Sequence, residues 1–326
     1  MSTHARPKVV VSRCLGFDAC RWNGAMIEDD FVQGLGEWVD YLPVCPEMEM
    51  GLGVPRDPVR LVRDKTGVRL RQPATGKDCT EDMEKFLHGY LDSVDQVDGF
   101  MLKGRSPTCG PMDVKIYANT AKGSASTKGR GMFAEAALAR FPGAAMEHEG
   151  RVKNFHIREH FLTKLFTLAK FREVAKQNTM KALINFHAAN KYLLMAYNQT
   201  EMRLLGKITA NQEKLPLPEV LAAYAKGLQK ALARGPKYTS NLNALMHVMG
   251  YFKNQLTPAE KAHFLDLMEN YRAGRVLLST LQALLRSWVL RFENDYLAVQ
   301  SFFAPYPPAL VELYDSGKGR EAWEIN

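Results

Sequence analysis

Short apolar runs alternate with amphipathic segments along the first third of the chain. The runs at residues 9–12, 42–45 and 100–103 are short and mostly apolar, which predicts buried β-strands. Between them, residues 31–39 and 83–94 repeat apolar side chains at helical spacing. Strands that alternate with helices in this way favour a parallel sheet with crossover helices.

The pattern of the next fifty residues extends this arrangement. It continues with a short apolar segment at residues 114–117, a Gly-, Ser-, Thr- and Lys-rich stretch at 121–131, a helix over 132–140 and a last strand within 143–148. The stretch at 121–131 is predicted to be a mobile loop, which either touches an anionic substrate or simply connects two elements. We therefore expect residues 1–150 to form a Rossmann-like, three-layer α/β domain with an open parallel sheet.

The pattern changes near residue 150, because the rest of the chain is helical with few interruptions. Thr257 precedes Pro258, which is typical of a helix N-cap followed by proline at the first helical position. After residue 305 we expect a turn and a short helix. Residues 151–326 are therefore predicted to form a second, all-α domain. Its helices are expected where apolar residues recur with a 3.6-residue period, at residues 162–174, 181–205, 218–233, 241–253, 258–273 and 277–297.

The composition is that of a soluble globular protein. The chain has 326 residues, of which 46% are hydrophobic and 24% charged, so it is long enough for two domains with separate cores. It contains no apolar run of about 18 residues, the length that a transmembrane helix needs. The N-terminus leads into the first strand without an apolar signal region. These features predict a cytoplasmic protein without membrane association.

Positive charge is concentrated in one segment. The net charge is +8, but residues 151–256 alone contain 17 Lys and Arg against 5 Asp and Glu, whereas the rest of the chain is slightly acidic. A confined positive field of this size favours a polyanionic partner, with nucleic acid as the first candidate. A Lys-rich, solvated helical surface is the alternative interpretation.

Three of the five cysteines follow predicted strands. Cys14 and Cys45 lie at the ends of the first two, and Cys109 lies in the loop after the third. The carboxyl ends of the strands in an open parallel sheet form its ligand crevice, so these thiols are expected to converge on a metal or cluster site. Iron–sulfur clusters normally have four thiolate ligands, and a site with three would leave one iron open. Cys20 and Cys79 are expected to be ordinary thiols, with Cys20 as a possible fourth ligand, and scattered core thiols are the alternative to a cluster.

Several short motifs occur in a fixed order over residues 8–150, and together they resemble the thiouracil desulfidase family. Residues 155–297, with the segment 186–198, resemble the helical YbgA-type domain, which is found fused to desulfidase domains. Such fusions resemble tRNA desulfidases that remove sulfur from thiolated uridines such as 4-thiouridine. The motifs of the first part are Ser12-Arg13-Cys14-Leu15-Gly16, Cys20-Arg21-Trp22-Asn23-Gly24, Cys45-Pro46-Glu47, Gly51-Leu52, Pro55-Arg56-Asp57-Pro58 and the run from Lys103 to Gly110.

The resemblance implies a cofactor. Cys14, Cys45 and Cys109 would bind three irons of a 4Fe–4S cluster, and the fourth, open iron would bind the sulfur of a thiocarbonyl group. Iron as a Lewis acid polarises the C–S bond and stabilises the departing sulfide. The reaction would be hydrolytic, giving uridine and sulfide with no net redox change.

The resemblance also implies the acid–base residues. Glu47 would be the general acid or base, and Ser106 would be its hydrogen-bonding partner near the substrate. Thr108 stands where the family often has Ser and receives no catalytic role. A carboxylate in this place can protonate the ring nitrogen of the substrate or activate water.

The helical half supplies the side chains that we expect to bind RNA. If residues 181–205 form one helix, His187, Lys191 and Asn198 share a face of it. Contacts from Lys and Arg to phosphates would give salt-sensitive, largely sequence-independent affinity. A thiouridine buried in folded tRNA would have to leave its stack. The expected partner is thiolated tRNA, and the candidate contacts are Lys153, Arg158, Lys191, Arg203 and Lys207.

Two other functions are compatible with parts of this pattern. The first is desulfuration of free thiouracil or thionucleosides, with the helical domain serving oligomerisation or another partner, although a small base needs no such positive field. The second is a cluster-bearing redox sensor that binds nucleic acid. A sensor has no need for Glu47 and Ser106 beside the thiols, so these two residues favour an enzyme.

Overall fold

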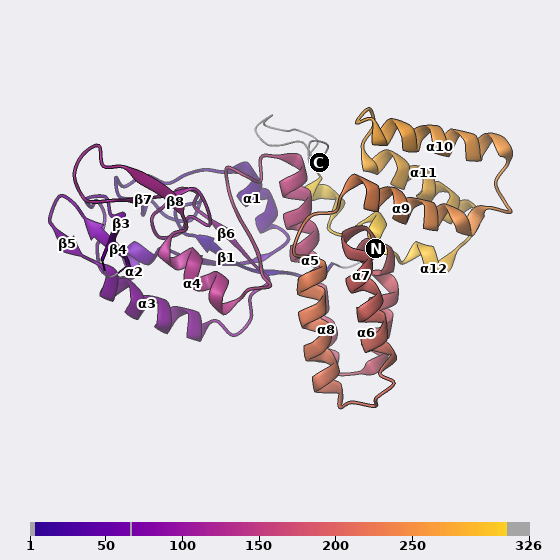
Figure 1. The fold of residues 1–326 in the computed structure, drawn as a ribbon, viewed down its shortest axis with the longest axis horizontal. Helices are drawn as coiled ribbons and strands as arrows, with labels where there is room; N and C mark the ends of the chain where they lie inside the picture. Colours follow the sequence, from indigo (N-terminus) through magenta and orange to yellow (C-terminus); the bar gives the residue numbers. More distant parts are fainter. Residues whose placement is uncertain (1–3, 66, 312–326) are drawn as a thin grey trace. The chain divides into compact units, whose positions relative to one another are not determined.

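The computed structural model of the chain describes residues 4–65 and 67–311 and divides into two compact units (Figure 1). One unit, the α/β unit, contains Ala5–Phe161, and the other, the helical unit, contains the chain from Leu162 onward together with His4. The division falls inside helix α5, Phe155–Gln177. The compact units thus divide later in the sequence than residue 150, where we place the domain boundary.

A four-stranded parallel sheet forms the centre of the α/β unit. Its order is β2-β1-β6-β9. Val9, Val10 and Val11 of β1, and residues 100–102 of β6, are fully buried, so side chains on both faces of these strands are covered, as in other α/β sheets. The predicted strands are confirmed, and they lie at Lys8–Ser12 (β1), Asp40–Val44 (β2), Gly99–Leu102 (β6) and Ala145–His148 (β9).

Helices cover both faces of this sheet (Figure 1). On one face, Leu87 of α3 and Phe133 of α4 share a hydrophobic core with Val10 and Phe100. On the other face lies α1, whose N-terminus is capped by Asp29, because its carboxylate accepts a hydrogen bond from the Val32 amide at 3.1 Å. The three predicted helices are confirmed, at Asp30–Gly36 (α1), Thr80–Ser93 (α3) and Met132–Arg140 (α4).

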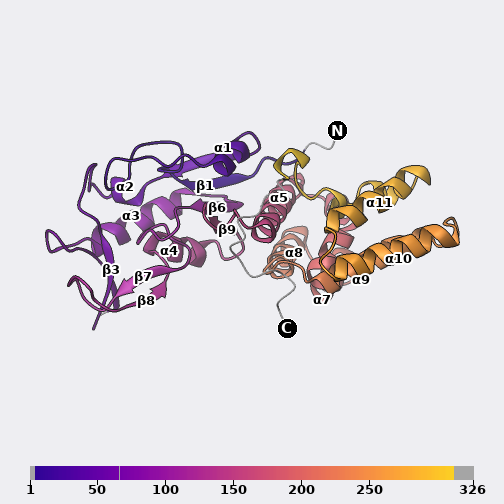
Figure 2. The same ribbon diagram turned by 90° about the horizontal axis from the view of Figure 1, so that it is seen from above.

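A second sheet, absent from the sequence-based prediction, lies to one side of the first (Figure 2). Its order is β5-β4-β3-β7-β8. The prediction of a loop at residues 121–131 is therefore wrong for residues 126–129, which pair antiparallel with β7. These residues form a polar edge strand with no apolar pattern to reveal it. The strands are Arg60–Asp64 (β3), Gly67–Gln72 (β4), Lys77–Asp78 (β5), Val114–Tyr117 (β7) and Ser126–Gly129 (β8).

The helical unit surrounds its own apolar core, which includes Tyr224, Phe252 and Trp288. The predicted cap of α10 is confirmed as a capping box, because Thr257 Oγ1 accepts from the Glu260 amide at 3.2 Å while Glu260 accepts from the Thr257 amide at 2.7 Å. Its helices are Met180–Ala189 (α6), Lys191–Ala210 (α7), Leu217–Ala231 (α8), Tyr238–Met249 (α9), Pro258–Arg272 (α10), Leu278–Arg291 (α11) and Asp295–Ala298 (α12), with the second half of α5.

Short 3-10 turns follow α9 and α12, and a further one spans Pro308–Leu310. Of the turn and short helix expected after residue 305, the described residues include this 3-10 turn, and residues 312–326 lie outside them. Among the residues that are described, the helices are all too short or too polar to cross a membrane.

The prediction of one helix over residues 181–205 is wrong. Asn190 ends α6 and precedes α7, and its side chain donates to the Phe186 carbonyl at 2.8 Å and accepts from Ser301 Oγ at 2.6 Å. Within α7, Asn198 has non-helical dihedral angles, φ −159° and ψ 98°. His187 therefore lies on a different helix from Lys191, and the shared face expected for His187, Lys191 and Asn198 does not exist. A similar break at Glu293, with φ 49°, separates α11 from α12.

Candidate active site

The three cysteines lie beyond the carboxyl ends of three adjacent strands. Cys14 follows β1, Cys45 follows β2 and Cys109 lies in the loop after β6, and these strands neighbour one another in the order β2-β1-β6. All three side chains are buried, with exposed fractions of 9%, 6% and 4%. The sheet topology thus brings the chain segments that carry the thiols to one edge, as the sequence predicts.

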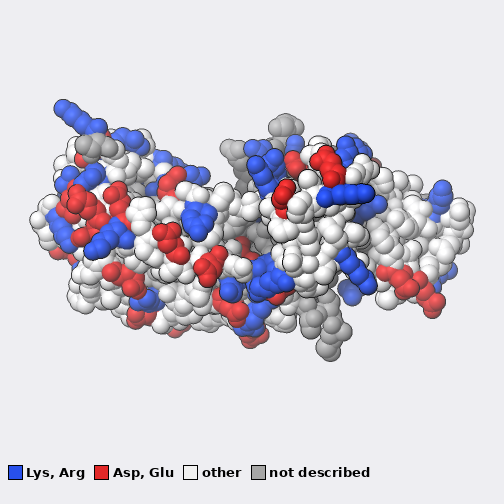
Figure 3. Space-filling model, turned by 90° about the horizontal axis from the view of Figure 1, so that it is seen from below, with Lys and Arg blue, Asp and Glu red and all other residues white. Residues whose placement is uncertain are grey.

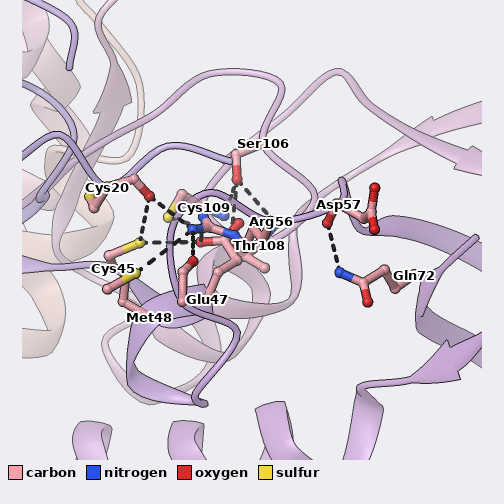
Figure 4. A network of polar contacts seen from close by, with 11 residues as sticks. Cys20, Cys45, Glu47, Met48, Arg56, Asp57, Gln72, Ser106, Thr108 and Cys109 are labelled. Carbon is pink, nitrogen blue, oxygen red and sulfur yellow. Dashed lines mark hydrogen bonds and ion pairs between the residues drawn. The ribbon is translucent and has the colours of Figure 1, made fainter. Parts of the chain in front are cut away.

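Glu47 and Thr108 connect two of these cysteines (Figure 4). Cys45 is the N-cap residue of α2, Pro46–Glu49, and its Sγ lies 3.6 Å from Glu47 Oε2. Thr108 Oγ1 donates to the other carboxylate oxygen, Oε1, at 2.7 Å and lies 3.7 Å from Cys109 Sγ. A buried carboxylate therefore contacts the Cys45 thiol directly and is connected to the Cys109 thiol through the Thr108 hydroxyl.

The structure corrects the expected partner of Glu47. The hydroxyl that reaches its carboxylate belongs to Thr108, not to Ser106. Ser106 Oγ lies 3.0 Å from Thr108 Oγ1 and accepts hydrogen bonds from the amides of Thr108 and Cys109, at 3.3 and 3.1 Å. Ser106 therefore stabilises the loop by hydrogen bonds to its backbone. Its connection to Glu47 is indirect, through the hydroxyl of Thr108. The sequence could not separate these roles, since both residues bear hydroxyls in the same short loop.

Arg56 is a residue of this site that the sequence did not assign a role. Its Nη1 donates to the carbonyls of Cys20 and Gly53, at 3.1 and 2.8 Å, and its Nη2 lies 3.9 Å from Glu47 Oε2. The guanidinium thus provides positive charge beside Glu47. It also connects the loop that contains Cys20 with the loop that contains Gly53. One sequence feature could have identified Arg56 as a site residue. It belongs to Pro55-Arg56-Asp57-Pro58, one of the motifs that carry the family resemblance.

The loop that carries Thr108 and Cys109 depends on two close backbone approaches. The amides of Gly131 and Phe133, at the start of α4, donate to the carbonyls of Gly110 and Thr108 at 2.8 and 2.9 Å. A Cβ atom at Gly131 would lie 2.3 Å from the Thr108 carbonyl oxygen, so this contact requires glycine. The helix start therefore fixes Thr108 against the sheet edge.

The remaining two cysteines differ from each other. Cys79 is fully buried in the core that α3 shares with the sheets, in line with an ordinary core thiol. Cys20 is equally buried, and its backbone carbonyl lies 3.8 Å from Cys45 Sγ. The backbone of Cys20 thus lies beside one of the expected ligands, Cys45.

The pKa values of three thiols near this site, Cys45, Cys109 and Cys20, are raised. The hydrogen bond with the Cys20 thiol, then burial and the nearby Glu47 carboxylate, raise the pKa of Cys45 above its usual range. Burial, and next the charge of Glu47, raise the pKa of Cys109. The hydrogen bond with Cys14 raises the pKa of Cys20 to about 11. Because metals bind thiolates, loading this site must displace protons and is favoured by higher pH.

Three buried cysteine side chains are donors of the kind that an iron–sulfur cluster needs. Among residues 4–65 and 67–311, no three His, Cys, Asp or Glu side chains are arranged to hold one ion. In a cluster each cysteine binds a different iron, so the thiols need not converge on one point. Buried sulfur donors are also the ligands that iron–sulfur clusters select.

The side chains expected to bind RNA differ in exposure. Lys153, Arg203 and Lys207 are exposed, and Lys191 is half-buried with its ammonium 5.9 Å from the centre of the Tyr192 ring. Arg158 is only 3% exposed and donates to the Val152 carbonyl at 2.9 Å, so it is not a candidate for phosphate contact. On the face drawn in Figure 3, basic and acidic side chains mix over the α/β unit, while basic side chains are prominent on the helical unit.

Comparison with known proteins adds two family matches. Residues 9–149 match the family described as 2-thiouracil desulfurase, and residues 191–307 match DUF1722, a family described as protein of unknown function. The resemblance inferred from the motifs is thereby confirmed: the chain joins a desulfurase-type segment to a YbgA-like, DUF1722-type segment.

Individual relatives are each similar to part of the chain. "Uncharacterized protein YbgA" of Escherichia coli (strain K12) is 25% identical over 158 residues, which are 48% of this chain and 93% of YbgA. "Uncharacterized protein YbbK" of Bacillus subtilis (strain 168) is 28% identical over 109 residues, 31% of this chain and 72% of YbbK. A solved structure of the [4Fe-4S]-dependent thiouracil desulfidase TudS is 27% identical and covers 45% of this chain and 93% of TudS, with a TM-score of 0.36.

Proposed function

We propose that this protein is an iron–sulfur-cluster-dependent desulfidase that converts 4-thiouridine in tRNA to uridine and releases sulfide. The observation that carries the proposal is the position of Glu47, whose two oxygens contact Thr108 Oγ1 at 2.7 Å and Cys45 Sγ at 3.6 Å. A carboxylate beside buried thiols suits proton transfer at a sulfur-binding metal site. The match of residues 9–149 to the 2-thiouracil desulfurase family supports the same class of reaction.

The cofactor of the proposed enzyme is a 4Fe–4S cluster held by Cys14, Cys45 and Cys109, with one iron left open. When bound, it supplies a Lewis acid that polarises the C–S bond and accepts the sulfur. The burial of all three side chains fits this role, because exclusion of water strengthens electrostatic interactions at the site.

Glu47 moves the protons of the reaction. Replacement of sulfur by oxygen at the ring carbon consumes one water and releases one sulfide, and no electrons are gained or lost. The carboxylate takes a proton from the attacking water and returns it to the ring nitrogen or the departing sulfur. Thr108 fixes Oε1 through its hydrogen bond, and Arg56 places a positive charge 3.9 Å from Oε2.

The helical unit is the proposed RNA-binding part. Residues 151–256 contain 17 basic and 5 acidic residues. Arg203 and Lys207 of the helical unit are exposed, as is Lys153, which belongs to the α/β unit. Phosphate contacts of this kind bind folded RNA through its backbone, without reading sequence. The thiolated nucleotide itself must leave its stack to reach the thiols, at a cost of a few kcal/mol.

A comparison of substrates tests this proposal. The full chain, reconstituted anaerobically with iron and sulfide, is incubated with tRNA that contains 4-thiouridine and, separately, with free thiouracil. We expect sulfide release and loss of the thiouridine absorbance with tRNA. Turnover of the free base alone would favour the alternative of a thiouracil or thionucleoside desulfidase. A stable cluster without desulfuration of either compound would favour a cluster-bearing, nucleic-acid-binding redox sensor.

A further inference from the structure

An open groove lies between α2 and α3, and the proposed reaction does not use it. The two helices are neighbours within the α/β unit (Figure 1, Figure 2). One wall of the groove is formed by residues 49–51, at the end of α2, and the other by one face of α3. The cavity volume is about 580 Å³. Ligand sites typically have volumes of about 300–1,000 Å³, so the groove is large enough for a nucleotide.

Two aromatic rings line the groove on the side of α3. Phe86 and Tyr90 are four residues apart, so they share a face of the helix. Their rings are stacked, with centroids 5.4 Å apart and an angle of 26° between the ring planes. Both side chains are half-buried, which leaves part of each open to the groove. Nucleobases of single-stranded RNA stack on aromatic side chains of this kind.

The groove also contains a positive charge that no ion pair neutralises. Its two acidic side chains are both paired, Glu49 with Arg13 and Asp82 with Lys77, whose Nζ lies 3.0 Å from Asp82 Oδ2. Lys85 is exposed, and among residues 4–65 and 67–311 it has no acidic partner within ion-pair distance. A lysine beside stacked rings suits the phosphate group of a nucleotide.

Gly89 keeps the groove open. It lies inside α3, where glycine is less favourable than alanine because its backbone loses more conformational freedom on folding. Packing does not require glycine here, since no atom lies within 4 Å of the position that a Cβ would take. In the helical unit, by contrast, a Cβ at Gly206 or Gly227 would lie 3.3 Å from His187 or 2.8 Å from Leu205. The lack of a side chain at Gly89 therefore leaves free space in the groove.

We propose that this groove binds a nucleotide next to the thiouridine of the substrate tRNA, with its base against Phe86 and Tyr90 and a phosphate at Lys85. The inference rests on the proposed function. The groove begins at the end of α2, and the same helix carries Glu47. Because α2 has only four residues, it is about 6 Å long. A nucleotide in the groove and a thiouridine at Glu47 can therefore belong to one strand.

Replacing Gly89 by Gln tests the inference without removing any contact inside the protein. The new side chain fills the groove, and because Gln is a better helix former than Gly, α3 should remain at least as stable. Gly34→Gln is the matched control. Gly34 is also exposed, lies in α1 and has no atom within 4 Å of its Cβ position, but it is not part of the groove. Thermal unfolding of the full chain shows whether both variants are folded.

The experiment compares two substrates of the anaerobically reconstituted, full-length protein. A tRNA that contains 4-thiouridine reaches both the groove and the reacting site, whereas the free 4-thiouridine nucleoside has no neighbouring nucleotide. In Gly89→Gln we expect the ratio of the KM for tRNA to the KM for the nucleoside to rise roughly fivefold to a hundredfold, the effect of losing one stacked base. In Gly34→Gln this ratio should equal that of the wild type.

A second pair of variants tests the phosphate contact. Lys85→Gln should weaken tRNA binding and reduce its salt dependence, measured by filter binding at several salt concentrations. Lys115→Gln removes the same charge at an exposed position outside the groove and should change neither quantity. Equal effects of the two variants would exclude Lys85 as a specific phosphate contact and overturn this part of the inference.

The outcomes separate this inference from the proposed function. An unchanged ratio of KM values in Gly89→Gln, with desulfuration of tRNA by the wild type intact, would overturn the inference alone. An equal rise in Gly34→Gln would also overturn it, because the effect would then not depend on the groove. A wild-type protein that acts on the nucleoside but not on tRNA would overturn the tRNA substrate of the proposed function and the inference with it.

Discussion

The hydroxyl of Thr108 donates a 2.7 Å hydrogen bond to Glu47 Oε1, although the two residues are 61 positions apart in the chain. This bond joins the loop after β6 to the short helix after β2. It leaves Oε2 directed at Cys45, 3.6 Å away. The orientation of the proposed acid–base group therefore depends on a residue that itself has no role in proton transfer.

Replacing Thr108 by Val should slow desulfuration while the cluster is still taken up. The side chain keeps its shape but loses the hydroxyl, and a hydrogen bond to a charged group contributes about 1.5–3 kcal/mol. We therefore expect kcat to fall roughly tenfold to a hundredfold, measured as sulfide release from thiolated tRNA. Thr108→Ser retains the hydroxyl and should keep most of the activity. Equal activity of the Val and Ser variants would show that the bond does not position Glu47.

Replacing Arg56 by Met should destabilise the α/β unit. The change leaves the carbonyls of Cys20 and Gly53 without their donor and the Glu47 carboxylate without its nearby positive charge. We expect a loss of about 2–4 kcal/mol in the free energy of unfolding, measured by urea denaturation. The exposed Arg63 offers the control, and Arg63→Met should change stability little.

Replacing Gly131 by Ala should disturb the site without touching any polar side chain. The added methyl group would lie 2.3 Å from the Thr108 carbonyl oxygen, so the start of α4 or the Thr108 loop must move. We expect a stability loss of about 1–3 kcal/mol and slower desulfuration. At Gly34 in α1 the same change meets no atom within 4 Å and should stabilise the helix slightly. Thermal unfolding of both variants makes the comparison, and a neutral Gly131→Ala would contradict it.

Reversing two charges on α7 should weaken tRNA binding. Arg203 and Lys207 are exposed and lie four residues apart on the helix, so they face the same side. In the double variant Arg203→Glu/Lys207→Glu we expect weaker binding. We also expect a weaker salt dependence. The slope of the logarithm of the binding constant against the logarithm of the salt concentration should be smaller in magnitude by about one for each phosphate that the variant no longer neutralises.

A matched variant excludes an effect of net charge. Lys115→Glu/Lys122→Glu makes the same change in total charge at exposed positions of the α/β unit, outside the basic segment. It should bind tRNA almost as the wild type does in a filter-binding assay at several salt concentrations. Equal weakening by both double variants would count against a binding surface on α7.

The first sheet could be predicted from the sequence because its strands are buried on both faces. Continuous apolar runs such as Val9-Val10-Val11 indicate such strands directly. Once the strands are predicted, the cysteines that follow them are predicted to lie at the carboxyl end of the sheet. The second sheet lacks this signal. In β3 and β4, Arg60, Arg63, Arg69 and Arg71 interrupt the apolar residues. These two strands pair with each other, but the other neighbour of β3, β7, lies much further along the chain.

Contacts between loops account for most of what the sequence did not reveal at the site. Thr108 reaches Glu47, and Arg56 reaches the Cys20 carbonyl, only after three separate loops have folded together. Residue types and spacing identify the hydroxyl-bearing loop, but they do not say which hydroxyl faces the carboxylate. The break at Asn190 was hidden for another reason, since apolar residues continue on both sides of it at nearly helical spacing.

The most direct test of cluster-dependent desulfuration of tRNA compares Glu47→Gln with the wild type after anaerobic reconstitution. Glu49→Gln, two residues along the same short helix, is the control. We predict equal iron content in all three proteins and cluster-dependent sulfide release from 4-thiouridine tRNA, slower by roughly 10²- to 10⁴-fold in Glu47→Gln alone. Unchanged release from Glu47→Gln, or release by protein without a cluster, would contradict the account.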